Sequence, residues 1–449
     1  MFTTLTLILV LGITAAVYWL IRSQHWRVIW LSLASLLWIW YWQKEALHAV
    51  LALTLVTWLA GLWLERGSRK LRAYRLGVLF LVLALIAWKY LGLISGTLKS
   101  VYSGFPDFGA KLVVPLGISY LVFKYISYLT DIYWSLIKSA KPLELLCFGS
   151  LFTIFSAGPL ERFERFGKQL RREPLRPDFK LLEAGLIRIC EGLFLKVVLA
   201  DWLAYLIKPL WESPSAYGLQ MRVLALFGYS LRIYFDFAGY SSIAIGASLL
   251  FDLKVSENFN SPYLSANITD FWKRWHISLS EWIRDYLFFP LSQGQSRRFW
   301  LQWMVPVLAM LICGLWHGAA WNFALWGLWH GVGIAVYQML QRWRKHRKLV
   351  TPGQVHWLRN LMGMTITFSF VTLGWLAFHL DGLELALQLL SPLTLLYIPA
   401  MALILILLLG GFRRISDFAL SSRWRAIYAL TLSLMFYCGM ETGFIYARF

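Results

Sequence analysis

The sequence is poor in charge and lacks several motifs that mark common enzyme classes. Only 15% of its 449 residues are charged and 59% are hydrophobic, which excludes a disordered chain and an ordinary cytosolic enzyme. There is no GxxxxGK[ST] loop and no GxSxG elbow, so an ATP-driven pump and a serine hydrolase are disfavoured. The four cysteines form no CxxC pair: Cys147, Cys190, Cys313 and Cys438. A disulfide framework or a zinc ribbon is therefore not suggested.

Apolar stretches of membrane-spanning length recur along almost the whole chain instead. The runs are continuous and do not alternate with polar residues, which favours helices over a β-barrel. The candidate spans are 5–21, 28–42, 46–64, 76–96, 111–134, 183–212, 219–236, 299–316, 319–341, 355–379, 394–410 and 426–446. The sequence thus predicts an all-α polytopic membrane protein with roughly 11–12 transmembrane helices, plus re-entrant and amphipathic interfacial helices. With no internal repeat, we expect one domain over 1–449, in which N-terminal helices (1–110) precede a catalytic core (111–449).

The positive charge is concentrated in short loops between the apolar runs. The net charge is +20, and the strongly basic loops are 65–75, 161–180 and 342–348. This pattern is typical of cytoplasmic loops facing anionic lipids, and no nucleic-acid module stands apart from the apolar runs. Three spans precede the first basic loop, so we expect an extracytoplasmic N-terminus. A basic n-region and a small-residue cleavage site are missing there, so a retained helix is expected and not a signal peptide.

Two segments interrupt the membrane pattern. Residues 143–160 lie between two segments that are both expected on the cytoplasmic side and end in Ser-Ala-Gly-Pro, which predicts a re-entrant or interfacial segment near a protein-lined cavity. Residues 252–298 mix charges with aromatics. Within 270–286, Phe271, Trp275, Ser278, Trp282 and Tyr286 recur at steps of three and four, which predicts one amphipathic helix at the interface.

Three histidines are candidates for chemistry because ionisable groups at membrane depth are costly. His276 lies in the amphipathic stretch, and His317 and His330 lie in a Trp- and Gly-rich segment. A neutral histidine can act as a general base for a hydroxyl, or be a hydrogen-bonded packing residue. Metal binding is not expected, because His317 and His330 would lie about 140° apart on one straight helix and no cysteines or carboxylates cluster beside them. The remaining histidines are interpreted as solvated or snorkelling: His25, His48, His346, His356 and His379.

Two long motifs resemble a known family. Residues 258–291 read N-F-N-S-P-Y-L-S-A-N-I-T-D-F-W-K-R-W-H-I-S-L-S-E-W-I-R-D-Y-L-F-F-P-L, and G-L-W-H-G occurs at 314–318 and again at 327–331. Both are similar to the membrane-bound O-acyltransferases (MBOAT), in their bacterial alginate O-acetyltransferase-like branch. Shorter matches follow in order at 114–120, 157–160, 192–201, 234–241 and 444–449.

The resemblance implies transfer of an acyl group, most simply acetyl, to hydroxyls of an exported cell-surface polysaccharide such as alginate. It implies a cytoplasmic thioester donor such as acetyl-CoA as substrate, no bound cofactor, and a location in the cytoplasmic (inner) membrane. His317 is expected to be the catalytic base or acyl relay and His276 to support it, with Trp275, Asn322 and His330 as further candidates. The chain carries no appended soluble domain, so a separate extracytoplasmic acyltransferase or acceptor protein is an expected partner, besides membrane lipids.

Other features leave alternatives open. Lys273 and Arg274 could meet the donor's phosphates or anionic lipid head groups. Where the family often has an aromatic–Arg step after Leu-Gly-Trp, this sequence has Leu-Ala-Phe followed by His379. Alternative activities on the same fold are D-alanyl transfer to teichoic acid and peptidoglycan O-acetylation. A transporter of acyl groups or polymer is the alternative from another class, disfavoured by the missing repeat symmetry.

Overall fold

Every regular element in the described part of the chain is a helix, as the sequence predicts. The structure is a computed structural model; it describes residues 5–67, 69–102, 106, 114–173, 176–292, 299–347, 356–379, 389–390, 392–419, 427–428 and 430–433. The chain divides into two compact units, residues 1–189 with 240–256, and 190–239 with 257–449. Helices α9 and α11 each continue from one unit into the other. The expectation of one membrane domain divided after residue 110 stays a prediction.

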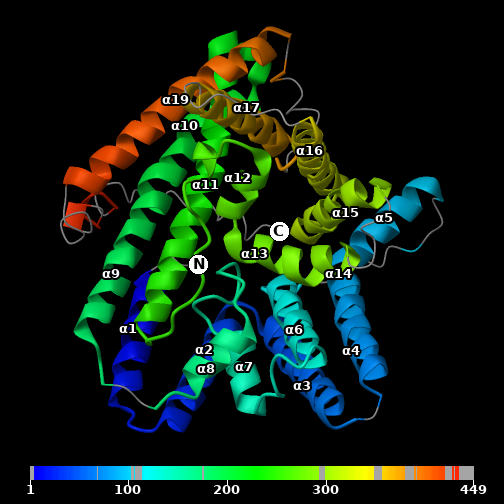
Figure 1. Cartoon of the computed structure of the whole chain (residues 1–449). Helices are drawn as coiled ribbons and strands as arrows, with labels where there is room; N and C mark the ends of the chain where they lie inside the picture. Colours follow the sequence, from blue (N-terminus) through cyan, green and yellow to red (C-terminus); the bar gives the residue numbers. More distant parts are fainter. Residues whose placement is uncertain are drawn as a thin grey trace. The chain divides into compact units, whose positions relative to one another are not determined.

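The first unit contains the N-terminal helices. Their bounds are α1 Leu5–Leu20, α2 Gln24–Trp42, α3 Lys44–Arg66, α4 Lys70–Leu85, α5 Leu91–Val101, α6 Ile118–Tyr133, α7 Pro142–Ser150, α8 Phe163–Leu170 and α9 Phe179–Leu193. Helices α3, α4 and α6 pack against one another (Figure 1). Gly61 and Gly77 lie against Tyr128 and Leu129 of α6, so small residues let these helices approach closely, as is common between membrane helices.

The second unit begins within α9, continues through a π-helical stretch, Phe194–Ala200, and holds the histidine motifs. Its helices are α10 Asp201–Glu212, α11 Leu219–Leu249, α12 Ile268–Arg274, α13 Ile277–Ile283, α14 Phe289–Ser292, α15 Phe299–His317, α16 Trp321–His346, α17 His356–Leu376 and α19 Pro392–Ala419. Lys196 bridges two carboxylates here, at 2.6 Å from Asp201 and 2.7 Å from Asp236. Because these buried charges pair with one another, they tie the π-helical stretch to α10 and α11.

Length and apolar composition mark several described helices as membrane-crossing candidates. Three are long enough by themselves: Lys44–Arg66, Lys70–Val101 and Trp321–His346. Shorter apolar helices are Thr6–Leu20, Trp303–His317 and Thr394–Gly410. The class of all-α membrane protein is thus confirmed, while the count of 11–12 spans stays a prediction. The span expected at 219–236 continues to Leu249, and most of 426–446 lies outside the described residues.

The segment 143–160 is irregular, as predicted. Helix α7 has nine residues, about 13 Å at 1.5 Å per residue, which is too short to cross a bilayer. The non-helical chain that follows is buried, and protein groups satisfy it: Ser35 Oγ accepts from Phe152 N at 3.1 Å, and Thr153 pairs with Ser248 at 2.7 Å. Its irregular backbone is therefore covered by protein, as membrane-depth loops require.

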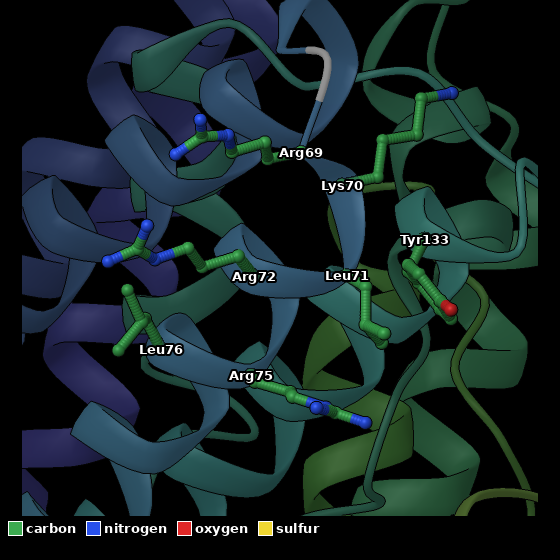
Figure 2. A pocket seen from close by; sticks show the side chains of 7 residues that line it. All are labelled: Arg69, Lys70, Leu71, Arg72, Arg75, Leu76 and Tyr133. Carbon is green, nitrogen blue, oxygen red and sulfur yellow. The ribbon is translucent and has the colours of Figure 1, made fainter.

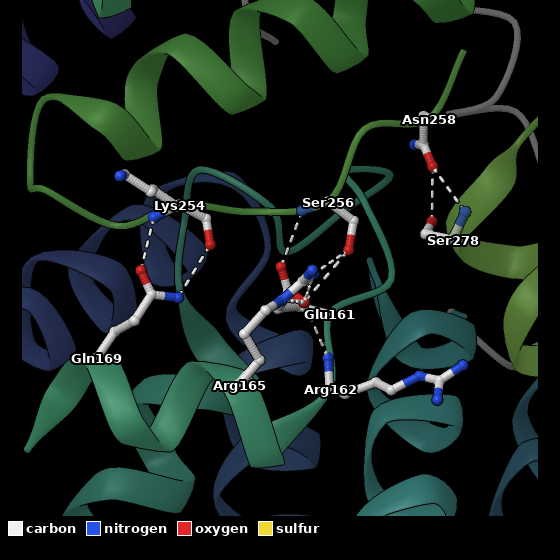
Figure 3. Close-up of polar contacts among 8 residues, drawn as sticks. All are labelled: Glu161, Arg162, Arg165, Gln169, Lys254, Ser256, Asn258 and Ser278. Carbon is white, nitrogen blue, oxygen red and sulfur yellow. Dashed lines mark hydrogen bonds and ion pairs between the residues drawn. The ribbon is translucent and has the colours of Figure 1, made fainter. Parts of the chain in front are cut away.

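Polar contacts from α8 and from the residues on either side of it hold the chain segment 252–256 within the first unit. Glu161 accepts from the backbone of Ser256 at 2.9 Å and pairs with Arg165, while Gln169 exchanges hydrogen bonds with the Lys254 backbone at 2.8 and 2.9 Å (Figure 3). Arg172 adds an ion pair to Asp252 at 2.8 Å. The basic loop 161–180 thereby fixes the stretch of chain that leads into the first histidine motif.

The single amphipathic helix expected over 270–286 is wrong. The chain forms two seven-residue helices, α12 and α13, which stop and restart at Trp275–His276, and a π-helical turn follows at Arg284–Phe288 (Figure 1). His276 has φ 42° and ψ 55°, in the left-handed region that a helix cannot contain. The spacing of three and four was real, but the aromatic side chains turn into a buried core: Phe271 and Trp275 are at most 1% exposed.

The placement of His317 and His330 on one straight helix is also wrong. Helix α15 ends at His317, three residues turn the chain, and α16 starts at Trp321. The two helices form a close hairpin, because a Cβ on Gly314 would lie 2.2 Å from Phe323 O and one on Gly327 would lie 2.3 Å from Met310 O. The angle of 140° therefore does not apply, and each histidine is positioned by a different helix.

Candidate active site

A left-handed turn positions His276. Its ring is buried, and two backbone hydrogen bonds bracket the turn: Asn260 N donates to Arg274 O at 3.0 Å and Ile277 N donates to Asn258 O at 2.9 Å. A non-glycine residue in this conformation carries a strain of about 1–3 kcal/mol. Such strain persists only where neighbouring structure enforces it, and here the incoming strand-like segment does so.

Asn258 is the residue that the sequence analysis missed. It is completely buried, and its Oδ1 accepts from Ser278 Oγ at 2.6 Å and lies 3.3 Å from His276 Nδ1 (the Ser278 contact is drawn in Figure 3). An amide oxygen only accepts, so Nδ1 must carry the proton when this contact is a hydrogen bond. The lone pair of His276 is then on Nε2. Nothing in the spacing of the motif signals this role, because Asn258 and His276 are brought together by the turn.

Burial keeps His276 neutral. The residue lies between two short helices, outside the helices long enough to span a membrane. Removing the imidazole from water lowers its pKa to about 3. The ring is therefore uncharged near pH 7, and Phe237 packs edge-on against it at 4.7 Å between ring centroids. A neutral imidazole with a defined tautomer can accept or hand on a proton.

His317 is the last residue of α15 and is 3% exposed. Its ring contacts Trp316 at 4.8 Å, Trp326 at 5.0 Å and Phe378 at 5.2 Å between centroids. Because α15 ends here, the side chain stands at the closed end of the α15–α16 hairpin. The surroundings of the ring are apolar and aromatic.

A continuous series of ring contacts joins the three histidines. His276 lies 6.4 Å from Trp316, which contacts His317 at 4.8 Å. Trp326 then contacts His317 at 5.0 Å and His330 at 4.9 Å. We call these five residues, His276, Trp316, His317, Trp326 and His330, the histidine–tryptophan series. The structure thus brings together all three histidines that the sequence singled out.

The other residues predicted from the sequence differ in burial and in the groups that they contact. Trp275 is 1% exposed and packs on Trp375 at 4.9 Å, inside the same aromatic core. Asn322 is half-buried at the start of α16 and donates over a long 3.5 Å to His379 O. His379 is itself buried and stacks on Trp211 at 4.2 Å, so its interpretation as solvated or snorkelling is wrong.

The two predicted donor-binding cations differ from each other. Lys273 is exposed on α12. Arg274 is half-buried and forms an ion pair with Asp270 at 3.0 Å. A paired guanidinium has fewer donors to offer a ligand, so Lys273 is the better placed of the two for an external anion.

A second basic feature lies in the first unit. A recess of about 920 Å³ is lined by Arg69, Lys70, Leu71, Arg72, Arg75, Leu76 and Tyr133. Figure 2 shows that its cationic side chains diverge, with Arg69 and Arg72 on one side and Lys70 and Arg75 on the other. Diverging cations suit several separate lipid head groups better than one bound ligand. Among the described residues, no three His, Cys, Asp or Glu side chains are grouped so as to hold a metal.

The fold and the buried histidines define a class, a helical membrane enzyme with imidazoles buried in an aromatic core. Residues 29–373 match the MBOAT, membrane-bound O-acyltransferase family, a range that includes all three histidines. The chain belongs to the MBOAT family and is a membrane O-acyltransferase.

Three similar proteins carry different names. The probable alginate O-acetylase AlgI of Azotobacter vinelandii is 33% identical over 390 residues, covering 85% of this chain and 75% of the relative. The peptidoglycan O-acetyltransferase of Helicobacter pylori is 29% identical over 396 residues, covering 81% and 73%. The teichoic acid D-alanyltransferase of Bacillus subtilis is 34% identical over 277 residues, covering 60% and 69%. The three names differ in acceptor and in acyl group.

Proposed function

We propose that this enzyme transfers an acetyl group from a cytoplasmic thioester, such as acetyl-CoA, to hydroxyls of an exported polysaccharide such as alginate. The observation that carries the proposal is the burial of His317 beside Trp316 and Trp326, within one series of contacts from His276. A sequence identity of 33% to a probable alginate O-acetylase supports a polysaccharide as the acceptor. The names of the other two relatives give the alternative activities, which are peptidoglycan O-acetylation and D-alanyl transfer to teichoic acid.

The proposed chemistry needs one proton acceptor and no redox step. The acceptor hydroxyl loses its proton to His317 as its oxygen forms a bond with the thioester carbonyl carbon. The carbon–sulfur bond then breaks, and the thiolate leaves and takes up the proton. The products are an ester and a free thiol. His276, with Nδ1 protonated toward Asn258, orients the reacting groups through its Nε2.

The membrane arrangement is part of the same proposal. The enzyme lies in the cytoplasmic (inner) membrane with its N-terminus outside, and the basic loops 65–75, 161–180 and 342–348 face the cytoplasm and its anionic lipids. Lys273 meets the phosphates of the donor. A separate extracytoplasmic acyltransferase or acceptor protein is the enzyme's partner outside the membrane.

The test compares two histidine variants in a strain that makes the acetylated polymer. His317→Ala removes the base, so polymer O-acetylation should fall by about 10²–10⁴-fold while the amount of membrane protein stays normal. His346→Ala is the matched control, because His346 is exposed in the last turn of α16 and should leave acetylation unchanged. Full acetylation by His317→Ala at normal abundance contradicts the proposal. Acylation of peptidoglycan or teichoic acid in place of the polysaccharide would select one of the alternatives.

A further inference from the structure

Three neighbouring buried rings carry polar atoms that have no hydrogen-bond partner among the described residues. Trp272, Trp326 and His330 are mutually in contact, with centroids 4.9–5.7 Å apart. Their exposed fractions are 7%, 0% and 0%. Within the described residues, the indole Nε1 of each tryptophan and both ring nitrogens of His330 have no hydrogen-bond partner. Buried polar groups are nearly always paired, so four such atoms in one cluster need an explanation.

The neighbouring tryptophans show that this core can satisfy an indole. Trp375 packs on Trp326 at 5.9 Å and donates to Tyr263 OH at 3.2 Å, and Tyr263 in turn donates to Ser230 O. Trp329, next to His330 in the chain, donates to Phe370 O at 3.0 Å. Indoles elsewhere in the described residues also lack a partner, Trp211 among them, so it is the grouping of four such atoms around Trp326 that sets this cluster apart.

Gly374 of α17 leaves the edge of His330 uncovered by a side chain. A Cβ at position 374 would lie 2.8 Å from His330 Nε2 and 2.9 Å from Trp329 Cδ1. Any larger residue would press on the imidazole, so glycine is what lets α17 approach this edge of His330 so closely. Trp326 also contacts the ring of His317 at 5.0 Å, which places the cluster next to the proposed base.

Indole N–H groups can only donate, so a ligand here must offer an acceptor oxygen. We infer that Trp272, Trp326 and His330 bind the carbonyl oxygen of the acyl group during transfer, an inference that rests on the proposed function. As the acceptor hydroxyl adds to the carbonyl carbon, negative charge develops on that oxygen. Preformed donors in an apolar site stabilise such charge strongly. When the carbon–sulfur bond breaks, the negative charge moves from the oxygen to the leaving thiolate and the carbonyl group forms again. The three protein side chains are unchanged at the end.

The first experiment removes one N–H at a time and keeps an aromatic side chain at the position. Trp272→Phe and Trp326→Phe should each lower acylation per unit of folded enzyme by about 10²-fold, as for loss of one oxyanion donor. Phenylalanine is smaller than tryptophan, so each variant also leaves a small cavity and its unfolding temperature in detergent should fall. Trp329→Phe is the matched control: it loses a satisfied hydrogen bond and should lose stability with little change in acylation.

A second measurement separates this inference from the proposed function. Acetonyl-CoA and S-propyl-CoA differ only by a carbonyl in place of a methylene, and neither can transfer an acyl group. The wild-type enzyme should bind acetonyl-CoA about tenfold more tightly, and the preference should disappear in Trp272→Phe and His330→Phe.

The outcomes distinguish the possibilities. Normal acylation by both Trp→Phe variants overturns the inference, whether or not CoA is the donor. Loss of acylation no greater than the loss of folded enzyme also overturns it, because the two indoles would then be packing residues. If neither analogue binds while His317→Ala is inactive and the Trp→Phe variants lose acylation per unit of folded enzyme, the carbonyl site stands and only the CoA donor is wrong.

Discussion

Asn258→Ala is the substitution that tests the geometry of the His276 turn most directly. The change removes the buried amide oxygen that accepts from Ser278 Oγ at 2.6 Å and lies 3.3 Å from His276 Nδ1. The backbone carbonyl of Asn258, which accepts from Ile277 N at 2.9 Å, remains. The turn therefore keeps both backbone hydrogen bonds that bracket it and loses the side chain that selects the tautomer.

The magnitude follows from the two side-chain donors, His276 Nδ1 and Ser278 Oγ, since the third contact, from Ser278 N, is long at 3.4 Å. A buried donor that loses its acceptor costs about 1–3 kcal/mol, so two such donors lower the free energy of unfolding by about 2–6 kcal/mol. The backbone hydrogen bonds of the turn remain, so the left-handed strain at His276 is not released. We expect a loss at the lower end of this range, about 2 kcal/mol, which a domain with a stability of about 5–15 kcal/mol survives. O-acylation should fall further than protein abundance does, because the proton of His276 is no longer held on Nδ1.

Two further variants and one assay complete the test. Ser278→Ala removes a donor and keeps Oδ1 beside His276, so it should cost about 1 kcal/mol and leave acylation nearly intact. Asn258→Asp places a carboxylate beside the imidazole, which raises the pKa of His276. The pH below which activity is lost should therefore be higher in this variant than in the wild type. Polymer O-acylation per unit of folded enzyme is measured for each. Wild-type acylation and unfolding temperature in Asn258→Ala would refute the assignment of Asn258 as a positioning residue.

Three other outcomes are expected. Gly327→Ala pushes a Cβ to 2.3 Å from Met310 O and should destabilise the enzyme by about 1–3 kcal/mol in detergent melts, whereas Gly12→Ala, which meets no atom within 4 Å, should not. Burial lowers the pKa of His276 to about 3; its contribution to stability is therefore complete above pH 6.5 and declines as pH falls from 6.5 toward 3, by up to about 1.4 kcal/mol per pH unit, and His276→Gln should flatten this slope in melts across pH. Lys273→Ala should raise the KM for the donor and leave kcat unchanged; an unchanged KM would favour lipid anchoring.

The sequence predicted the class of fold and the three histidines because these depend on local signals. Apolar runs and basic loops report membrane helices directly, and the two motifs contain His276, His317 and His330 within short stretches. The error at 270–286 has a clear cause. Spacing of three and four identifies a face, but two short helices joined by a left-handed residue keep much of that spacing, and His276 carries no sequence mark of its conformation.

The partners of the site could not be predicted, because they come from distant parts of the chain. Asn258 reaches His276 through a backbone turn, and Phe378, in the turn after α17, reaches His317 across more than sixty residues of sequence. The same holds for His379, which a position at the end of a span suggested to be solvated and which instead stacks on Trp211. Contacts of this kind depend on tertiary packing, which periodicity does not report.

The α15–α16 hairpin also bears on how the enzyme is made. His317 and Trp326 are nine residues apart, and only a three-residue connection separates their helices. Contacts so close in sequence have a small loop-closure cost and can form early in folding. The contacts of the proposed base with Trp316 and Trp326 can therefore form while the hairpin inserts as a pair of helices, before α17 has left the ribosome. The ring contact of His276 with Trp316 spans forty residues and that of His317 with Phe378 spans sixty-one, so we expect both to form later. A folding intermediate that holds only the hairpin would thus already carry His317 against these two tryptophans, with Phe378 and the Asn258-supported turn still to dock.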